Sequence, residues 1–462
     1  MPTIDRPLWG SRVRAPLAPA AARLSASIEV DRPLAVHDIA ASRAHVAELH
    51  ALGLLADDGR DRLDGALASV GESIEAGTFE WNEAHEDVHM NVEAAVREIV
   101  GPELAGQLQA GRSRNEEIVT DERLWLLAAV PRLDALLFAV QRTLVSRATD
   151  EIDTVLPAHT HTQPAQPMLL AHHLLAHVEM LERDRERLAD AARRADRSPA
   201  GSGAAVGSGL PIDRARVAAR LGFGGVTANS LDAVADRDYA IELVSAAAMT
   251  LGHLSRLAAD LVLWSTPYLG FARIGDGYAS GSSMLPHKRN PDVAELIRGR
   301  AARANAQLGM LLGILHGLPL GYHRDLQETR GPMLDAVNSL DLCLRATDGM
   351  LAGVEFNREA MARAATAGHA LSTALAERLM AAGVPFRDAH WRIGELVAAA
   401  EVAGCDISEL PEATLHASLP ELASDRAVLP TLQQSLEATD VPGGTAPRRV
   451  RQALHATKER LA

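Results

Sequence analysis

The residues best suited to chemistry lie in one polar stretch, Gly281 to Pro291. It reads Gly-Ser-Ser-Met-Leu-Pro-His-Lys-Arg-Asn-Pro and brings hydroxyls, an amine and an amide into one short segment. Small polar residues precede it, which predicts a mobile loop. A helix is expected from Asp292 to Leu315, with Asn290 as its N-cap and Pro291 at its first position. Because a helix N-terminus offers free N–H groups and a positive dipole end, this stretch favours an anionic ligand.

Lys288 stands out further because lysine is rare in this chain. Lys288 and Lys458 are the only lysines among 46 basic residues, and all the others are arginine. The ammonium of lysine is a compact point charge that a planar guanidinium does not replace. We therefore interpret Lys288 as a ligand-binding or catalytic residue rather than a surface residue without a role.

A second polar stretch, Gly111 to Glu117, precedes a helical pattern from Ile118 to Arg147 that we expect to be kinked or interrupted at Pro131. Ser113 and Glu116 have the spacing of a capping box, and capping alone would explain the serine. Two arginines and an asparagine at the same helix end supply more donors than capping needs. Besides simple helix capping, the more specific hypothesis is that this helix end binds a carboxylate of a ligand.

A third stretch, Pro157 to Pro167, contains prolines among polar side chains and is predicted to be an ordered, non-helical loop. His159 and His161 alternate there with threonines, a pattern that metal ligands can also show. No carboxylate or cysteine lies at ligand spacing nearby, so a histidine placed for proton transfer is the better interpretation. We expect no metal and no cofactor.

Composition limits the class of protein. A chain of 462 residues is too long for one compact core. Its net charge of -14 argues against a nucleic-acid or anionic-membrane partner. The pair Cys343 and Cys405 gives no disulfide framework, which is consistent with a reducing cytoplasm. No signal peptide is evident over Met1 to Gly10, and charged residues interrupt the apolar segment Ile241 to Trp264, so we expect no membrane span.

Long helical patterns dominate the middle of the chain. They cover Met168 to Arg194, Tyr239 to Trp264, Asp292 to Leu315 and Met333 to Gly353, and helices of this length and apolar content usually pack into a bundle. The glycines of Ser198 to Pro211 indicate close packing or flexibility, since no phosphate-loop ending follows. We predict an all-α fold with an N-terminal helical domain (1–110), a central helical-bundle domain with the polar loop (111–357) and a small C-terminal helical domain (358–462).

Taken together, these stretches resemble the fumarase/aspartase superfamily and, within it, the argininosuccinate lyase family. The stretch Gly281 to Asn290 is similar to the superfamily signature Gly-Ser-Ser-x-Met-Pro-x-Lys-x-Asn. The finer resemblance rests on Gly111-Arg-Ser-Arg-Asn115, Thr160-His161 with Gln163, Tyr322-His-Arg-Asp-Leu-Gln-Glu328, Leu8-Trp9-Gly10 and Gly383-Val-Pro-Phe-Arg387. The similarity covers nearly the whole chain in the expected order.

The resemblance implies a three-domain subunit with a long central helical bundle, assembled as a homotetramer whose active sites are shared between subunits. It also implies anti elimination of fumarate from a small-molecule substrate, here argininosuccinate, to give arginine in amino-acid biosynthesis in the cytoplasm. By carry-over, Ser282 removes the Cβ proton, while Lys288 and Asn290 stabilise the aci-carboxylate that forms. His161, paired with Glu295, acts near the departing nitrogen as acid or proton relay.

The same carry-over assigns the substrate-binding residues. Ser113, Arg114, Asn115 and Thr160 would hold the succinyl carboxylates. Ser27, Asp31, Tyr322 and Gln327 match positions that contact the rest of the substrate. His89 of an Asp-x-His motif, Gln163 and Arg330 complete the predicted substrate-binding residues.

The chain also departs from the family pattern. Met284-Leu285 inverts the usual order, and Glu116-Glu117 replaces Asp-Gln. In the Tyr322 motif, His323 replaces Asn, Thr329 replaces Asp, Arg330 replaces a substrate-facing Lys and Gly331 replaces an acid. Most changes surround the non-succinyl half of the substrate, so the released amine stays open. The alternatives are a lyase acting on another N-substituted aspartate in specialised metabolism, adenylosuccinate lyase, and a non-catalytic structural relative.

Overall fold

The computed structural model describes residues 17–422 and 428–462, and helices make up most of them. The predicted features of the first ten residues, including Leu8-Trp9-Gly10, lie outside this range. The chain divides into two compact units. The first comprises Met1–Arg132, Arg187–Ala247 and Ala304–Asn338, and the second comprises Leu133–Glu186, Ala248–Arg303 and Ser339–Ala462. The predicted division into three domains stays a prediction.

Long helices contribute residues to both units, as the sequence pattern predicts. They are α7 (Arg114–Asp150), α8 (Leu170–Ala195), α11 (Asp238–Trp264), α12 (Asp292–Leu315) and α13 (Arg330–Ala352). The bounds of α12 match the prediction, and those of α8, α11 and α13 differ from it by only a few residues. The all-α fold class is confirmed.

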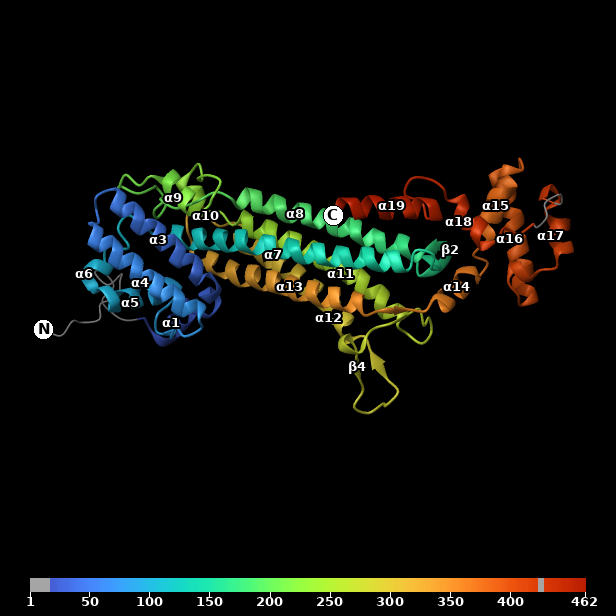
Figure 1. The fold of residues 1–462 in the computed structure, drawn as a ribbon, viewed down its shortest axis with the longest axis horizontal. Coiled ribbons are helices and arrows are strands. Elements are labelled where there is room, and N and C mark those ends of the chain that lie inside the picture. Colours follow the sequence, from blue (N-terminus) through green and yellow to red (C-terminus); the bar gives the residue numbers. More distant parts are fainter. Residues whose placement is uncertain (1–16, 423–427) are drawn as a thin grey trace. The chain divides into compact units, whose positions relative to one another are not determined.

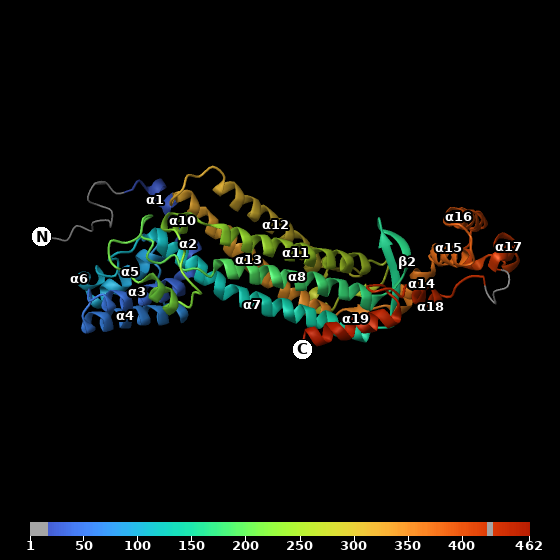
Figure 2. The same ribbon diagram turned by 90° about the horizontal axis from the view of Figure 1, so that it is seen from above.

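The first unit contains three antiparallel-packed helices, α3 (Ala35–Ala51), α4 (Asp57–Glu75) and α5 (Val88–Val100), which lie side by side (Figures 1 and 2). Apolar side chains such as Leu63 and Val96 form their shared core. Shorter helices complete this unit: α1 (Pro19–Ser25), α2 (Ile28–Asp31), α6 (Pro102–Ala105), α9 (Arg214–Arg220) and α10 (Ser230–Ala235).

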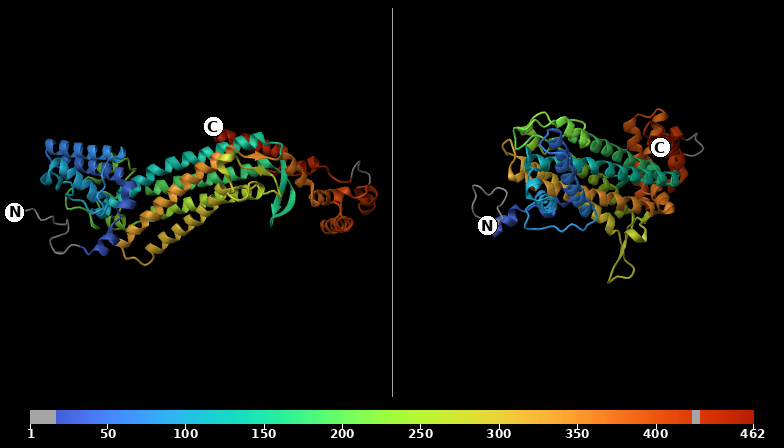
Figure 3. Two further views of the ribbon diagram at one scale, coloured as in Figure 1. Left: turned by 90° about the horizontal axis from the view of Figure 1, so that it is seen from below. Right: turned by 60° about the vertical axis from the view of Figure 1, so that its left-hand side comes forward.

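Polar contacts join the long helices within the second unit. The hydroxyl of Thr143 on α7 donates to Asp348 on α13 at 2.5 Å, and His253 on α11 lies 2.7 Å from a carboxylate oxygen of Asp184 on α8. Shorter helices α14 (Arg358–Thr366), α18 (Leu432–Ala438) and α19 (Pro447–Arg460) also belong to this unit. Helices α15 (Ser372–Ala381), α16 (Phe386–Ala403) and α17 (Glu412–Ser418) gather into a small cluster around buried leucines (Figure 3).

Helix α7 differs from the sequence prediction in two respects. It runs without interruption through Pro131, so the predicted interruption does not occur, while a kink at Pro131 stays a prediction. Nor does the predicted capping box form at its start. The Ser113 hydroxyl accepts from the Asn115 N–H at 3.3 Å, but the Glu116 carboxylate accepts from the Gly203 N–H at 2.6 Å instead.

The same helix is, among those that the structure describes, the one whose length and composition would also suit a membrane span. Length and composition alone are weak evidence for a membrane span, since the long core helices of folded proteins share both properties. Its Glu122 is fully buried and accepts a hydrogen bond from the Tyr239 hydroxyl, a packing expected inside a folded protein.

Short antiparallel strand pairs are formed by segments that lie between the helices. The predicted non-helical segment near Pro157 is a β-hairpin of β1 (Val155–Thr160) and β2 (Gln163–Leu169). Strands β3 (Ala272–Arg273) and β6 (Glu355–Phe356) pair, as do β4 (Ser280–Gly281) and β5 (Arg289–Asn290). The sequence did not indicate these strands.

The glycine-rich run between α8 and α9 is explained by close packing. Gly203 has a φ of +60°, and a Cβ there would lie 2.5 Å from the carbonyl oxygen of Gly207. No other residue type fits at this position without a backbone shift.

Candidate active site

A pocket of about 370 Å³ in the first unit brings together five predicted substrate-binding residues from distant parts of the sequence: Arg114, Asn115, Tyr322, Gln327 and Arg330. Six more residues complete its lining: Leu17, Ser25, Glu86, Asp87, Ile118 and Arg324. The start of α7, the 3-10 helix η3 (Arg324–Thr329) and the start of α13 supply most of this wall. The cations and hydrogen-bond donors here suit a ligand that has an anionic group at one end and polar groups at the other.

Arg114 is held in place by Asp87. One carboxylate oxygen of Asp87 caps α5 by accepting from the Met90 N–H at 2.8 Å, and the other accepts from Arg114 at 3.0 Å. The Arg114 side chain keeps 26% of its surface exposed, so its guanidinium still faces solvent. The aspartate thus orients a cation that remains available to a carboxylate ligand.

Arg330 lies in the pocket wall and is tied to buried acids. Its guanidinium donates to Asp31 and lies 3.5 Å from Glu122, while the Ser27 hydroxyl donates to Asp31 at 2.5 Å. Burial alone would lower the pKa of Arg330, but the charges of these carboxylates raise it above its usual value. Ser27 and Asp31 are buried behind the pocket, where they support Arg330.

The segment η3 is hydrogen-bonded to the backbone at Ser25. Arg324 donates to the Ser25 carbonyl at 2.8 Å and to Glu86, and Gln327 donates to the same carbonyl at 3.3 Å. Sequence reasoning missed Ser25, Glu86, Asp87 and Arg324 as lining residues. Two of them carried a signal, because Arg324 lies inside the Tyr322 motif and Asp87 begins the Asp-x-His motif.

His89 does not line this pocket. Its ring is buried, with Nδ1 2.9 Å from an oxygen of Asp38 and 3.8 Å from oxygens of Glu117 and Asp121. Burial alone would lower the pKa of His89, but the charge and hydrogen bond of Asp38 raise it to about 10. The imidazolium therefore belongs to a buried ionic network that supports α5 and α7.

The hairpin of β1 and β2 presents His161 in the second unit. Thr160 pairs with Gln163 at the end of the ladder, and His161 and Thr162 form the two-residue turn. Both turn residues have left-handed backbone conformations, with φ of 53° and 59°. Such conformations are costly without glycine and are often found at functional sites, and here they place the histidine at an exposed tip.

The segment between β4 and β5 also forms an exposed hairpin tip (Figures 1 and 3). Ser282 Oγ accepts hydrogen bonds from the Met284 N–H at 3.3 Å and the Leu285 N–H at 3.0 Å. Donors aimed at a hydroxyl oxygen favour its ionised form, which a serine acting as a base requires. Lys288 lies exposed on the same tip.

The base of this hairpin is anchored. Arg289 lies 2.5 Å from Asp276, and the Tyr278 ring packs so closely on Gly349 of α13 that a Cβ there would lie 1.7 Å from the hydroxyl oxygen. A larger residue at Gly349 would push the Tyr278 ring away. The base of the hairpin is thus held by side-chain contacts, whereas its tip is exposed.

Asn290 is not the N-cap of α12. Its amide donates to the Ser280 hydroxyl at 3.4 Å, and the Glu295 N–H donates to the Pro291 carbonyl at 3.1 Å. Glu295 is half exposed, 3.9 Å from Arg298. The predicted catalytic residues, together with Thr160 and Gln163, thus belong to the second unit, whereas the pocket belongs to the first.

Comparison with known proteins identifies the group to which this chain is related. Residues 12–305 match the model of the lyase family, and residues 369–437 match that of the argininosuccinate lyase C-terminal region. An argininosuccinate lyase from Thiobacillus denitrificans is 45% identical over 98% of each chain. The chain belongs to the argininosuccinate lyase family. The resemblance drawn from its sequence motifs is therefore confirmed.

Solved structures agree with this family membership. EDDS lyase in complex with formate is 26% identical, with a TM-score of 0.81 over 97% of this chain and 90% of that one. A class II fumarase from Schistosoma mansoni is 15% identical, with a TM-score of 0.74 over 87% of this chain and 92% of that one, and shows the fold alone. The argininosuccinate lyase family thus has the mostly helical fold of the fumarase/aspartase superfamily.

Proposed function

We propose that this chain eliminates fumarate from argininosuccinate and releases arginine. The observation that carries the proposal is the pocket in which Arg114, held by Asp87, stands beside Asn115, Tyr322 and Gln327. It combines an available cation for a succinyl carboxylate with polar groups for the second half of the substrate. The name and 45% identity of the relative from Thiobacillus denitrificans support the same reaction.

In the proposed mechanism, the Ser282 oxygen removes a Cβ proton next to a carboxylate. The two backbone N–H groups that face this oxygen stabilise its ionised form. Lys288 and Asn290 stabilise the extra negative charge of the aci-carboxylate. The Cα–N bond then breaks, and His161, paired with Glu295, delivers a proton to the leaving nitrogen of arginine.

Substrate contacts are divided between the two hairpins and the pocket. We assign the succinyl carboxylates to Ser113, Arg114, Asn115 and Thr160. Gln163, Tyr322, Gln327 and Arg330 then contact the guanidino half, while Ser27, Asp31 and His89 act by supporting these groups from the interior. Arg330 keeps its charge next to Asp31, so it recognises the substrate from a fixed position.

We further propose a cytoplasmic homotetramer whose active sites draw loops from different subunits. Large apolar side chains are exposed along the long helices, including Met249, Leu263, Leu296 and Leu342. Contact with other subunits would remove this apolar surface from water. It would also allow a pocket of one subunit to meet a catalytic loop of another.

The decisive experiment measures fumarate release from argininosuccinate by ultraviolet absorbance. We expect turnover by the full-length protein and a loss of at least about 100-fold in the Ser282→Ala variant, since a positioned base contributes that much. The Ser283→Ala variant removes a neighbouring hydroxyl and should retain most activity. No release by the folded wild-type protein would contradict the proposed substrate, and adenylosuccinate and other N-substituted aspartates would be tested next.

A further inference from the structure

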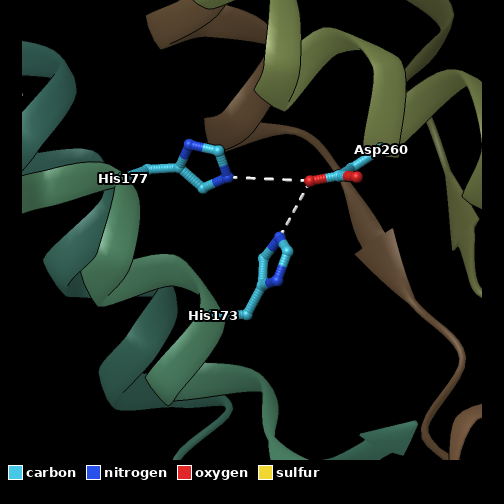
Figure 4. Close-up of side chains that lie close together, drawn as sticks. All are labelled: His173, His177 and Asp260. Carbon is cyan, nitrogen blue, oxygen red and sulfur yellow. Dashed lines mark hydrogen bonds and ion pairs between the residues drawn. The ribbon is translucent and has the colours of Figure 1, made fainter. Parts of the chain in front are cut away.

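Two histidines and an aspartate that the proposed mechanism does not use converge in the second unit. His173 and His177 lie four residues apart on one face of α8, and Asp260 faces them from α11 (Figure 4). The same oxygen, Oδ2 of Asp260, lies 3.0 Å from Nε2 of His173 and 3.7 Å from Nε2 of His177. All three ligand atoms lie within 4.8 Å of one another.

These spacings fit a bound divalent transition metal. Zinc binds imidazole nitrogen and carboxylate oxygen at about 2.0–2.2 Å, which separates neighbouring ligand atoms in a tetrahedral site by roughly 3.4 Å. The observed 3.0 Å and 3.7 Å bracket that separation. A metal can therefore sit between the three side chains with little movement of either helix.

The surroundings also suit a metal site. Trp264 is buried and packs on His173, with ring centroids 5.0 Å apart, so it limits the rotation of that imidazole. His177 is buried as well. On the other side, 34% of the Asp260 side chain and 21% of the His173 side chain remain exposed. An ion can enter from there, and water can complete its coordination.

A second cluster, formed by Asp38, His89 and Asp121, has similar spacing but does not suit a metal. It is fully buried, so no side of it is open to an entering ion, whereas the hydrogen bond between His89 and Asp38 has its counterpart between His173 and Asp260. The guanidinium of Arg112 lies 3.3 Å from the neighbouring Glu117, so positive charge is present without a metal.

We propose that His173, His177 and Asp260 bind one divalent transition-metal ion of the zinc type. The ion joins α8 to α11 and stabilises the helical bundle, and it takes no part in the elimination. Sequence reasoning, which expected no metal, missed this site because the carboxylate lies far along the chain from the two histidines.

Cobalt(II) is the probe of choice, since its visible absorption reports coordination by protein ligands. The full-length protein is stripped with a chelator, dialysed and titrated with Co²⁺, with absorption and calorimetry as readouts. We expect one equivalent per chain, displacement by Zn²⁺ and a higher melting temperature in the metal-bound protein. The His177→Gln and Asp260→Asn variants should each bind at least about tenfold more weakly, as expected for the loss of a ligand.

The His172→Gln variant is the matched control, since it removes the neighbouring imidazole of α8 that lies outside the triad. It should bind Co²⁺ as the wild type does. Equal binding by the wild type and both triad variants, or no binding by the wild type, would overturn the site. If His177→Gln fails to fold, Asp260→Asn decides alone, because it preserves the shape of the side chain. Fumarate release that requires the metal would overturn the structural role.

Discussion

The carboxyl group of Glu116 is poised to make stability depend on pH. It is buried, and this burial raises its pKa from 4.5 to about 7, although Arg112 and the Gly203 N–H oppose the shift. A raised acid pKa destabilises the folded state as the pH rises above 4.5, and the penalty is complete above about pH 7. We predict that the stability of Glu116→Gln relative to wild type increases as the pH rises from 5 to 8, by roughly 3 kcal/mol at most.

Urea unfolding of both proteins at pH 5 and pH 8 measures this difference. Glutamine keeps an acceptor for the Gly203 N–H and removes the ionisable carboxyl group, together with its attraction to Arg112. Glu98→Gln, an exposed carboxylate on α5, is the control and should change the pH profile far less. A Glu116→Gln variant whose advantage is the same at both pH values would show that this carboxyl group is not the source of the pH dependence.

Pro131 is a source of instability within an element, because it lies inside the uninterrupted helix α7. Proline cannot donate to the carbonyl four residues earlier, and its ring crowds that group. We predict that Pro131→Ala raises the melting temperature, with a gain of about 1–3 kcal/mol after the greater freedom of the unfolded chain is counted. Thermal unfolding followed by circular dichroism measures the change.

Ala128→Gly provides a control of opposite sign in the same helix. Residue 128 is exposed, so this substitution should lower stability by about 1 kcal/mol through helix propensity alone. If Pro131→Ala melts at the same temperature as wild type or below it, the proline must instead favour a bend that α7 needs.

The long helices and the short strands differ in how well the sequence predicts them. The three-and-four spacing in Asp292–Leu315 gives the bounds of α12 because one helix face is buried over many turns. The hairpin of β1 and β2 carries no such repeat, and its turn uses His161 and Thr162 where glycine or asparagine would be the usual signal. Its prolines indicated only a non-helical segment.

At the scale of the whole molecule, the sequence predicted the members of the site better than their placement. Motifs identified Arg114, Tyr322 and Gln327, and the structure brings them to one pocket. The same carry-over assigned Asp31 and His89 to the substrate, but both are buried and neither lines the pocket. Whether a polar side chain lines a pocket or supports it depends on tertiary packing, which one sequence without its relatives does not express.

The proposed sharing of active sites predicts that two inactive variants restore activity when mixed. Arg114 belongs to the first unit and Ser282 to the second. If each site draws these two residues from different subunits of a symmetric oligomer, random reassembly of Arg114→Ala with Ser282→Ala leaves about one quarter of the sites with both residues intact. Fumarate release after co-refolding should then approach a quarter of the wild-type rate. A mixture of Ser282→Ala and Lys288→Ala, both in one loop, should stay inactive. Failure of the first mixture, with oligomers formed normally, would show that each chain builds its own site.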